Sequence, residues 1–306
     1  MLIQDLQVVL KVAEFKSITG AAESLDMSTA TASAAVKRVE RTLGVELFIR
    51  TTRQLRLSAA GERYLPNCEQ ALEMLSKAEQ GVKDDLDIVD GEIRLAVPSD
   101  LGRTIVLPWL DEFMAEHSGV SLKLHVSDSN IDFYRDPVDI ALRYGSMDDS
   151  SLYGFKICDV PGVLCASPDY LKRNGIPKNL DEVTEHNALL YQVHDVIHDT
   201  WEFVRNGEHT KIKVSGDRAT NDAELVRRWC VAGKGFAAKS ILDMSQDLFD
   251  KKLQVVLPEY RLKCKELWLV CPSRQSITPA MRILRDTLKE NCEMILKQLE
   301  DRSILG

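Results

Sequence analysis

Apolar residues at the start of the chain recur at three- and four-residue spacing, the period of a helix with one buried face. The spacing predicts a first helix over residues 4–15 and a second helix from Ile18 to Leu25. A third helix is predicted over residues 29–43, because Ser28 can cap its first turn and Gly44 can end it. The inward-facing positions of this third helix are Ala32, Ala35, Val36, Val39 and Leu43.

A basic hairpin is predicted after the third helix. Residues 47–50 and 55–57 form its strands, and residues 51–54 form its turn, with Arg53 at the tip. Two helices around a tight turn, followed by such a hairpin, are typical of a winged helix-turn-helix. Its third helix enters the major groove of DNA, and the hairpin lies beside the backbone or in the minor groove. From Thr31 to Ser58 six basic residues stand against two acidic ones, a local charge of +4 on a chain of net charge −8.

The candidate DNA-contacting residues lie on the outer face of the third helix and in the hairpin. The small side chains among them have a second interpretation, since Ala and Ser also allow two helices to pack closely, and for Ser33 both roles can hold at once. The full set is Ser28, Thr29, Ala30, Thr31, Ser33, Ala34, Lys37, Arg38, Arg50, Thr51 and Arg53.

One long helix is predicted next. Residues 59–87 have high helix propensity apart from Pro66, which must lie in the first turns or kink the helix. Apolar residues follow alternating three- and four-residue steps, a heptad seam that misses only at Glu79. A helix that is apolar along one stripe needs a partner, so we predict self-association. Packing on the chain's own C-terminal domain is the alternative. The seam residues are Leu65, Cys68, Leu72, Leu75, Val82, Leu86 and Val89.

Beyond Gly91 the pattern changes to alternating strands and helices. This alternation predicts a largely parallel sheet with helices on both faces, and about 215 residues are enough for two lobes. The last helix is expected to begin at Pro279, with Thr278 as its cap. The other predicted strands are 93–97, 120–126, 138–143, 162–166, 211–214 and 235–238, and the other predicted helices are 101–117, bent near Pro108, one from Pro168, and 222–232.

Polar residues at the strand ends are the candidate ligand-binding residues, because ligands of open α/β sheets bind beyond the carboxyl ends of strands. Hydroxyl groups together with Arg143 and Lys239 suit a small organic anion. Asp100 and Asp128 oppose an anion, and each can instead cap a helix or pair with Arg143, so both interpretations stay open. The set is Ser99, Asp100, Ser127, Asp128, Ser129, Arg143, Ser167, Asn221, Lys239 and Ser240.

The N-terminal residues resemble the LysR-type transcriptional regulators. The resemblance runs from Leu2 to about Leu299, and Arg50 to Arg53 further resemble the subgroup with a basic wing. The chain departs from the family at Thr29, Ala30 and Ala34, where many members carry Gln, Pro and Arg, so its operator preference is not predicted. The residues that carry the resemblance are Ala21-Ala22, Leu25, Ser28, Ser33, Val36, Glu40, Leu43-Gly44, Leu47-Phe48, Arg50-Thr51, Leu57 and Ala60-Gly61.

The resemblance implies a mixed fold and a set of partners. It implies a mostly α winged helix-turn-helix over residues 1–58, a dimerisation helix over 59–90, and a two-lobed α/β effector-sensing domain like the periplasmic binding proteins over 91–306. Lobe 1 would hold about 91–161 and 265–306, lobe 2 about 162–264, and the chain would cross between them near Pro161 and Cys264. The implied partners are double-stranded DNA with an imperfect inverted repeat, a second copy of the chain in a dimer or tetramer, RNA polymerase and a small effector.

Enzymatic function has little support in the sequence. No GxSxG, HExxH or GxxxxGK motif is present, so we predict no catalytic residue and no cofactor. His194 and His198 are four residues apart and flanked by Asp195 and Asp199, and on a helix they could hold zinc. A solvated loop is the favoured interpretation. A sensor domain with metal-dependent or hydrolytic activity is the alternative function.

The seven cysteines are scattered and contain no CxxC pair, which is typical of a reducing cytoplasm. Cys158 and Cys165 are a formal candidate for a redox pair, although burial in the core is the favoured interpretation. The chain begins without a signal-peptide pattern and has no apolar stretch of transmembrane length. We therefore expect a cytoplasmic protein without a membrane partner.

Overall fold

The computed structural model describes residues 2–50, 55–84, 89–129, 131–133, 136–146, 152–193 and 196–304. The chain divides into two compact units, Met1–Leu86 and Asp87–Gly306. None of the helices in the described ranges is long and apolar enough to cross a membrane.

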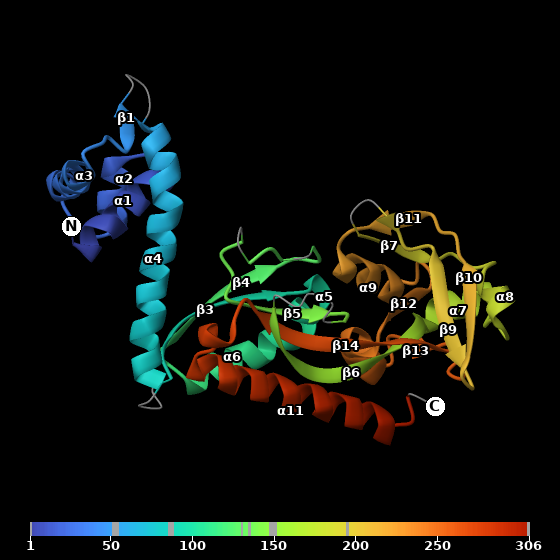
Figure 1. The fold of residues 1–306 in the computed structure, drawn as a ribbon. Helices are drawn as coiled ribbons and strands as arrows, with labels where there is room; N and C mark the ends of the chain where they lie inside the picture. Colours follow the sequence, from blue (N-terminus) through green and yellow to red (C-terminus); the bar gives the residue numbers. More distant parts are fainter. Residues whose placement is uncertain are drawn as a thin grey trace. The chain divides into compact units, whose positions relative to one another are not determined.

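The N-terminal unit has the predicted helices and hairpin (Figure 1). The Ser28 hydroxyl accepts a hydrogen bond from the Thr31 N–H at the start of the third helix, and Gly44 ends that helix in the left-handed conformation, at φ 70°. The predicted capping was therefore correct. The elements are α1 (Ile3–Phe15), α2 (Ile18–Ser24), α3 (Thr29–Leu43), β1 (Phe48–Arg50), β2 (Leu55–Leu57) and α4 (Ala59–Asp84).

The apolar side chains of helix α4 are buried near its start and more exposed further along. Leu65 belongs to the core between α1, α2 and α3, and Cys68 is buried as well. Leu75 is 47% exposed. Pro66 lies inside the helix and beyond its first turn. The last predicted seam position, Val89, lies outside the helix and packs against the core of the C-terminal unit, so the seam does not extend to it.

The C-terminal unit is built around a nine-stranded mixed sheet. Strand β3 (Gly91–Val97) pairs in parallel with β4 (Val120–Val126) and β5 (Ile140–Tyr144). Strand β14 (Arg261–Cys271) then pairs antiparallel with both β5 and β6 (Tyr153–Ala166). The prediction of a largely parallel sheet is therefore wrong, because two long strands that run in opposite directions form its middle.

The strands β6 and β14 run side by side between the two ends of this unit (Figure 1). Pro161 lies in β6 and Cys264 in β14, where the register of the pair shifts between Leu262 and Lys265. The predicted strand 162–166 is thus the end of a longer one. At the far end lie β7 (Leu189–Val193), β8 (Val196–Ile197), β9 (Thr200–Arg205), β10 (Glu208–Lys213), β11 (Arg218–Thr220), β12 (Ala237–Ser240) and β13 (Gln254–Val255).

The helix after β3 contains an irregular turn. It begins as α5 (Ser99–Leu101), continues as a π-helical turn over Gly102–Val106 and becomes α6 (Leu107–Glu116). Pro108 cannot donate a backbone hydrogen bond, so the irregularity lies on its N-terminal side rather than at the proline. The other helices are α7 (Pro168–Asn174), α8 (Leu180–Val183), α9 (Ala223–Val231), α10 (Ile241–Phe249), the 3-10 turn Arg274–Ser276 and α11 (Pro279–Asp301).

The main core lies between the sheet and its covering helices. Leu101 and Leu110 of the first helical run, Leu242 of α10 and Leu284 and Leu288 of α11 belong to one buried cluster. The Thr278 hydroxyl accepts a hydrogen bond from the Met281 N–H, as predicted for the cap of α11. This continuous core holds the strand ends in fixed positions.

Candidate functional site

The outward face of α3 carries the candidate DNA-contacting side chains. Ser33 is half-buried beside the packed face, which is consistent with both roles considered for it. Thr51 and Arg53 lie outside the described residues, as does the side chain of Arg50. The predicted residues that are exposed are Ser28, Thr29, Ala30, Thr31, Ala34, Lys37 and Arg38, and Arg41 is exposed with them.

Two side chains of α3 hold the head together. The Arg38 guanidinium donates two hydrogen bonds to the Asp5 carboxylate on α1, over 3.1 and 2.5 Å. The Glu40 carboxylate accepts hydrogen bonds from the backbone N–H groups of Leu47 (2.8 Å) and Phe48 (3.3 Å). Arg38 is therefore engaged within the protein, whereas Lys37 and Arg41 have no ion pair with any described residue.

The C-terminal unit contains a cavity of about 540 Å³ beyond the strand ends. Seven of the ten predicted ligand-binding residues line it. Ser99, Ser167 and Asn221 do not: Ser99 turns its hydroxyl to Asp128, Ser167 caps α7 through the Tyr170 N–H, and Asn221 is exposed before α9. The seven are Asp100, Ser127, Asp128, Ser129, Arg143, Lys239 and Ser240.

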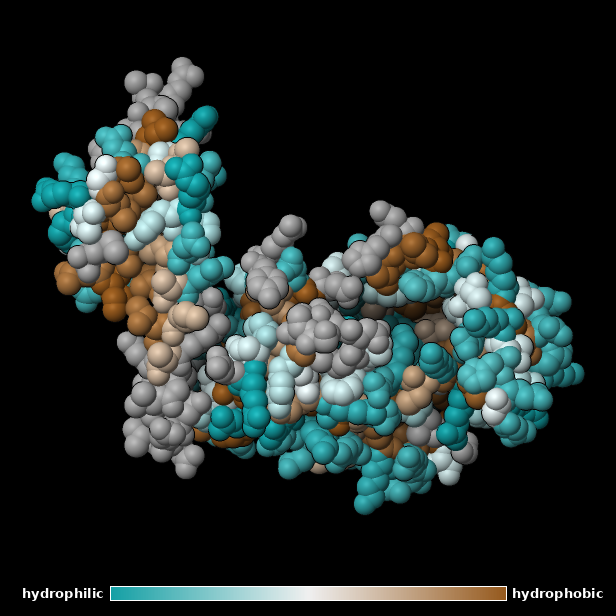
Figure 2. Space-filling view, viewed as in Figure 1, coloured by the Kyte–Doolittle hydropathy of each residue, from teal (hydrophilic) through white to brown (hydrophobic). Residues whose placement is uncertain are grey.

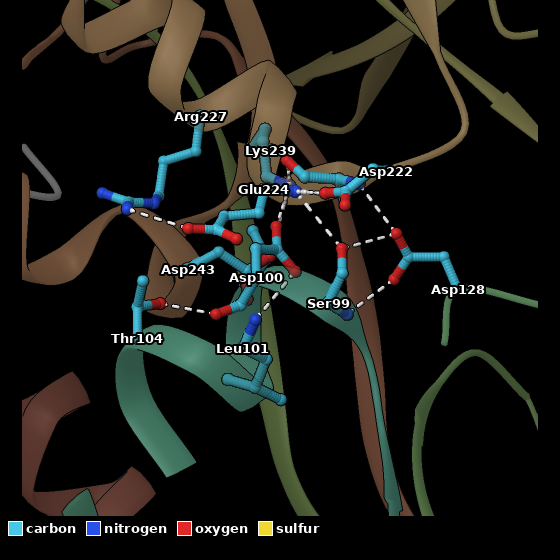
Figure 3. Close-up of polar contacts among 12 residues, drawn as sticks. Ser99, Asp100, Leu101, Thr104, Asp128, Asp222, Glu224, Arg227, Lys239 and Asp243 are labelled. Atoms are coloured by element: carbon cyan, nitrogen blue, oxygen red, sulfur yellow. Dashed lines mark hydrogen bonds and ion pairs between the residues drawn. The ribbon is translucent and has the colours of Figure 1, made fainter. Parts of the chain in front are cut away.

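Lys239 and Asp100 form a buried ion pair on the wall of the cavity (Figure 3). The Lys239 ammonium group also donates to the backbone carbonyl of Ala223 over 3.2 Å. Burial alone would lower the pKa of Lys239, but the carboxylate of Asp100 raises it. The predicted cation at this position is thus balanced by the protein's own Asp100 carboxylate.

Asp243 is buried next to that pair. The Tyr144 hydroxyl donates a hydrogen bond to it over 2.8 Å and lies 3.0 Å from the Ser240 hydroxyl. Burial, followed by the negative charge of Asp100, raises the pKa of Asp243 to about 8. Its carboxyl group is therefore mostly protonated at neutral pH and adds little negative charge to the cavity.

Asp128 is the third carboxylate of the cavity wall, and it caps two helices. It accepts hydrogen bonds from the backbone N–H groups of Ser99 and Ala223, both over 2.7 Å. Asp100 likewise accepts one from the Leu101 N–H over 2.8 Å. The capping interpretation is therefore confirmed for Asp128, whereas Asp100 lies inside α5 and pairs with Lys239. The proposed ion pair of either aspartate with Arg143 is wrong.

Three cations of the cavity wall have no such partner. Arg143 donates to the backbone carbonyl of Ser146 over 3.3 Å, and no described carboxylate lies within ion-pair distance of it, of Lys263 or of Lys265. Burial lowers the pKa of the Lys265 ammonium group. Glu202 also lines the cavity, but His209 (2.8 Å) and Lys211 (3.7 Å) bind its carboxylate.

The sequence interpretation missed several residues of this wall. Lys263 and Lys265 flank Cys264 on β14. Residues two apart in a strand lie on the same face, so this pair of lysines could have been recognised in the sequence as a candidate cationic surface. The aromatic residues Tyr191 and Trp201 carried no comparable pattern. Other apolar wall residues are Ile131, Phe133, Leu142, Val193 and Leu262.

The residues considered for a metal site and for a redox pair do not form such sites in the part of the chain that the structure describes. No group of three His, Cys, Asp or Glu residues that could hold a metal ion occurs in the described residues. His194 and Asp195 lie outside them, and His198 stacks on Tyr191 with 6.3 Å between ring centroids. Cys158 and Cys165 are seven residues apart on one extended strand, about 23 Å, so they cannot form a disulfide with each other.

The chain is similar to known regulators over nearly its whole length. Residues 3–62 match "Bacterial regulatory helix-turn-helix protein, lysR family", and residues 87–293 match "LysR substrate binding domain". An uncharacterised HTH-type transcriptional regulator of Haemophilus influenzae is 31% identical, over 89% of this chain and 94% of that one. The HTH-type transcriptional regulator DmlR of Escherichia coli is 30% identical, over 94% of each chain.

A solved structure is similar to the chain over both of its units. CrgA, a LysR-type transcriptional regulator from Neisseria meningitidis, is 28% identical and matches with a TM-score of 0.60 over 94% of this chain and 98% of that one. Together with the two family matches and the two relatives, this places a DNA-binding and an effector-binding domain in one chain. The chain therefore belongs to the LysR-type transcriptional regulators, which are transcription factors rather than enzymes.

Proposed function

We propose that this regulator binds an operator with an imperfect inverted repeat and that a small organic anion in the cavity changes this binding. The observation that carries the effector part is the set of cations without carboxylate partners, Arg143, Lys263 and Lys265, on the wall of a cavity of about 540 Å³. Because the other charged groups there are paired, capped or protonated, an anion would complete the charge balance.

The DNA part of the proposal rests on α3. Its first turns expose Thr29, Ala30, Thr31 and Ala34, and a helix of this kind inserts its N-terminal residues into the major groove. Lys37 and Arg41 would bind phosphates, and Arg50, Thr51 and Arg53 of the wing would bind the backbone. Short side chains at the groove-facing positions allow few bidentate base contacts, so shape and backbone contacts would contribute much of the affinity.

Self-association is supported by apolar surface on the N-terminal unit. Leu75 of α4 is 47% exposed, and Leu72, three residues earlier on the same face of the helix, is half-buried. Figure 2 shows further apolar side chains gathered over α1 and α2, where Ile3 and Phe15 are exposed. LysR-type regulators form oligomers. We propose a dimer built on α4 that pairs further into a tetramer.

The lobe boundaries follow from β6 and β14. We propose that the lobes comprise about 91–161 with 265–306, and about 162–264, because these two strands join the ends of the C-terminal unit. A shift of the lobes relative to each other when the anion binds would change the angle between the DNA-binding heads of a dimer. RNA polymerase as a further partner and a cytoplasmic location are part of the same proposal.

The DNA proposal is tested by footprinting the purified chain on the DNA upstream of its own gene, across a salt series. Protection of an inverted repeat with half-sites about one helical turn apart, or a multiple, is expected. Arg53→Ala should weaken binding to all sequences, whereas Thr29→Ala or Ser33→Ala should change the preference between operator variants. Protection without sequence preference at every salt concentration would contradict the proposal.

The effector proposal is tested by thermal unfolding with small organic acids and their neutral amides, for example benzoate with benzamide and hexanoate with hexanamide. At least one acid should raise the unfolding midpoint of the wild-type chain, while its amide should not. Arg143→Ala should lose this response, and Lys178→Ala, which removes an exposed cation outside the cavity, should keep it. Equal responses to acids and amides would overturn the proposal.

A further inference from the structure

Asp128 lies two residues beyond β4, and groups of the protein itself bind its carboxylate. The Ser99 N–H donates to one carboxylate oxygen over 2.7 Å, and the Ser99 hydroxyl (2.6 Å) and the Ala223 N–H (2.7 Å) donate to the other (Figure 3). All these donors are neutral, so a full negative charge is held here by amides and hydroxyls.

The donors come from segments that are far apart in the sequence. Ser99 begins the helix after β3, and Ala223 begins α9. The Ser99 hydroxyl also accepts a hydrogen bond from the Glu224 N–H over 3.2 Å, and Arg103 pairs with the Glu224 carboxylate over 2.9 Å. Asp128 therefore joins the two ends of the C-terminal unit at the edge of the cavity.

We infer that Asp128 is a built-in carboxylate ligand, which occupies the place that an acidic group of a bound molecule would otherwise take. Backbone N–H groups at the starts of helices bind carboxylates well, and the buried Ser99 hydroxyl adds a third donor, with 4% of Ser99 exposed. Because the protein supplies this anion, the two ends of the unit are held together without an effector. The inference deepens the proposed function, on which it rests.

The built-in carboxylate determines which end of the cavity an effector's acidic group can use. Lys263 and Lys265 lie on β14 and Arg143 on β5, whereas Asp128 follows β4, and the strand order is β14-β5-β3-β4. Three strand spacings separate β14 from β4, about 14 Å. An effector would therefore place one acidic group near the cations and an uncharged, apolar body toward Asp128. A second acidic group there would meet a like charge.

The test is chemical rescue of the full-length chain. Asp128→Ala leaves two N–H groups and one hydroxyl without their acceptor and opens space for a small carboxylate. Its unfolding midpoint should fall by about 4 °C or more. A concentration series of formate or acetate should then raise the midpoint of this variant well beyond its effect on the wild-type chain. Formamide at the same concentration should not do so, and neither should sodium chloride at the same ionic strength.

Two variants serve as controls. Asp169→Ala removes an exposed aspartate from the first turn of α7 and should show no response to formate. Asp128→Asn keeps the volume of the side chain but loses the charge, so it should lose stability without gaining a formate response. If Asp128→Ala does not fold, the stability of Asp128→Asn relative to the wild type is the test. A formate effect on Asp128→Ala no larger than that on the wild type would overturn the inference, as would an Asp128→Asn chain of wild-type stability.

Failure of this inference is distinct from failure of the proposed function. Rescue by formate together with an acid response that survives Arg143→Ala would support the role of Asp128 and overturn the assignment of the cations. An acid response lost in Arg143→Ala, with no formate rescue in Asp128→Ala, would overturn the role of Asp128 and leave the anion site standing.

Discussion

Asp5 on α1 and Arg38 on α3 form a two-point ion pair inside the DNA-binding head. Both hydrogen bonds run from the guanidinium group to the carboxylate, whose side chain is only 4% exposed. The pair fixes the helix that carries the DNA-contacting residues against the first helix. Arg38 thus orients α3, and the neighbouring Lys37 and Arg41 are exposed cations of that surface without an ion pair to any described residue.

Asp5→Ala should destabilise the N-terminal unit by about 1–3 kcal/mol, because the guanidinium group loses its partner at the junction of two helices. Glu14→Ala removes the exposed pair with Lys11 on the same helix and should cost about 0.5 kcal/mol or less. Urea unfolding followed by circular dichroism measures both. Equal effects of the two substitutions would contradict the structural role of Asp5.

Acid should weaken the same contact. The hydrogen bonds from Arg38 lower the pKa of Asp5 below its usual value, so the ionised carboxylate stabilises the folded head above the unfolded-state pKa of about 3.9. This contribution is lost as the pH falls through the folded-state value. The stability difference between wild type and Asp5→Asn should therefore shrink on acidification below about pH 4. A difference that stays constant to lower pH would contradict this.

Asp243 should give the opposite pH dependence. Burial raises its pKa to about 8, against about 3.9 in the unfolded chain. Between these values the unfolded chain is ionised and the folded chain is protonated, so stability falls as the pH rises through this window. Relative to Asp243→Asn, the wild type should lose on the order of 1 kcal/mol per pH unit between pH 5 and 8.

Urea unfolding at several pH values measures this slope for the wild type, for Asp243→Asn and for the exposed Asp169→Asn. The asparagine at position 243 still accepts the hydrogen bond from the Tyr144 hydroxyl, so the two chains differ mainly in the titrating group. Asp169→Asn should follow the wild type. A slope for Asp243→Asn equal to that of the wild type would show that Asp243 is not the titrating group.

Matched acids should distinguish the two ends of the cavity. Benzoate and terephthalate differ by one carboxylate, as do hexanoate and adipate. Where the wild-type chain binds the monoacid of a pair, it should bind the diacid about tenfold or more weakly than the monoacid. The reason is that the second carboxylate of the diacid would lie near Asp128. Asp128→Ala should remove or reverse this preference. Calorimetric titration measures it, and tighter binding of diacids by the wild type would contradict the orientation proposed for the effector.

Leu72→Asp combined with Leu75→Asp should convert the oligomer to a monomer, because two charges would lie in the apolar surface of α4. Asn67→Asp combined with Gln70→Asp adds the same charge on the opposite side of the helix, where both residues are exposed, and should leave the oligomer intact. Light scattering of the purified chains gives the mass. An unchanged mass for the leucine double variant would rule out α4 as the dimer contact.

Local patterns predicted the elements well, and contacts between distant segments were predicted poorly. The caps at Ser28 and Thr278 were found because each acts on the next turn of chain. The antiparallel pairing of β6 with β14 was missed, since nothing near either strand specifies its partner. The donors around Asp128 were missed for the same reason, because Ala223 is distant in sequence and offers only its backbone.

The cavity was predicted in part because strand ends can be recognised without knowing the topology. Seven of the ten proposed residues line it, while Ser167 and Asn221 follow the same rule and lie elsewhere. Lys263 and Lys265 were missed because they lie within a strand that passes the cavity rather than at a strand end. The sequence could not show that β14 passes there.

The register shift of β14 lies between Leu262 and Lys265, so Lys263 sits at a point where the regular ladder to β6 is interrupted. An interrupted ladder lets a strand change its twist at lower cost than a regular one. An anion held by Lys263 and Lys265 would thus bind the more flexible part of the strand that both lobes share. Binding would then change the flexibility of the connection between the lobes directly. Both lobes would respond without a relay of side-chain contacts between them.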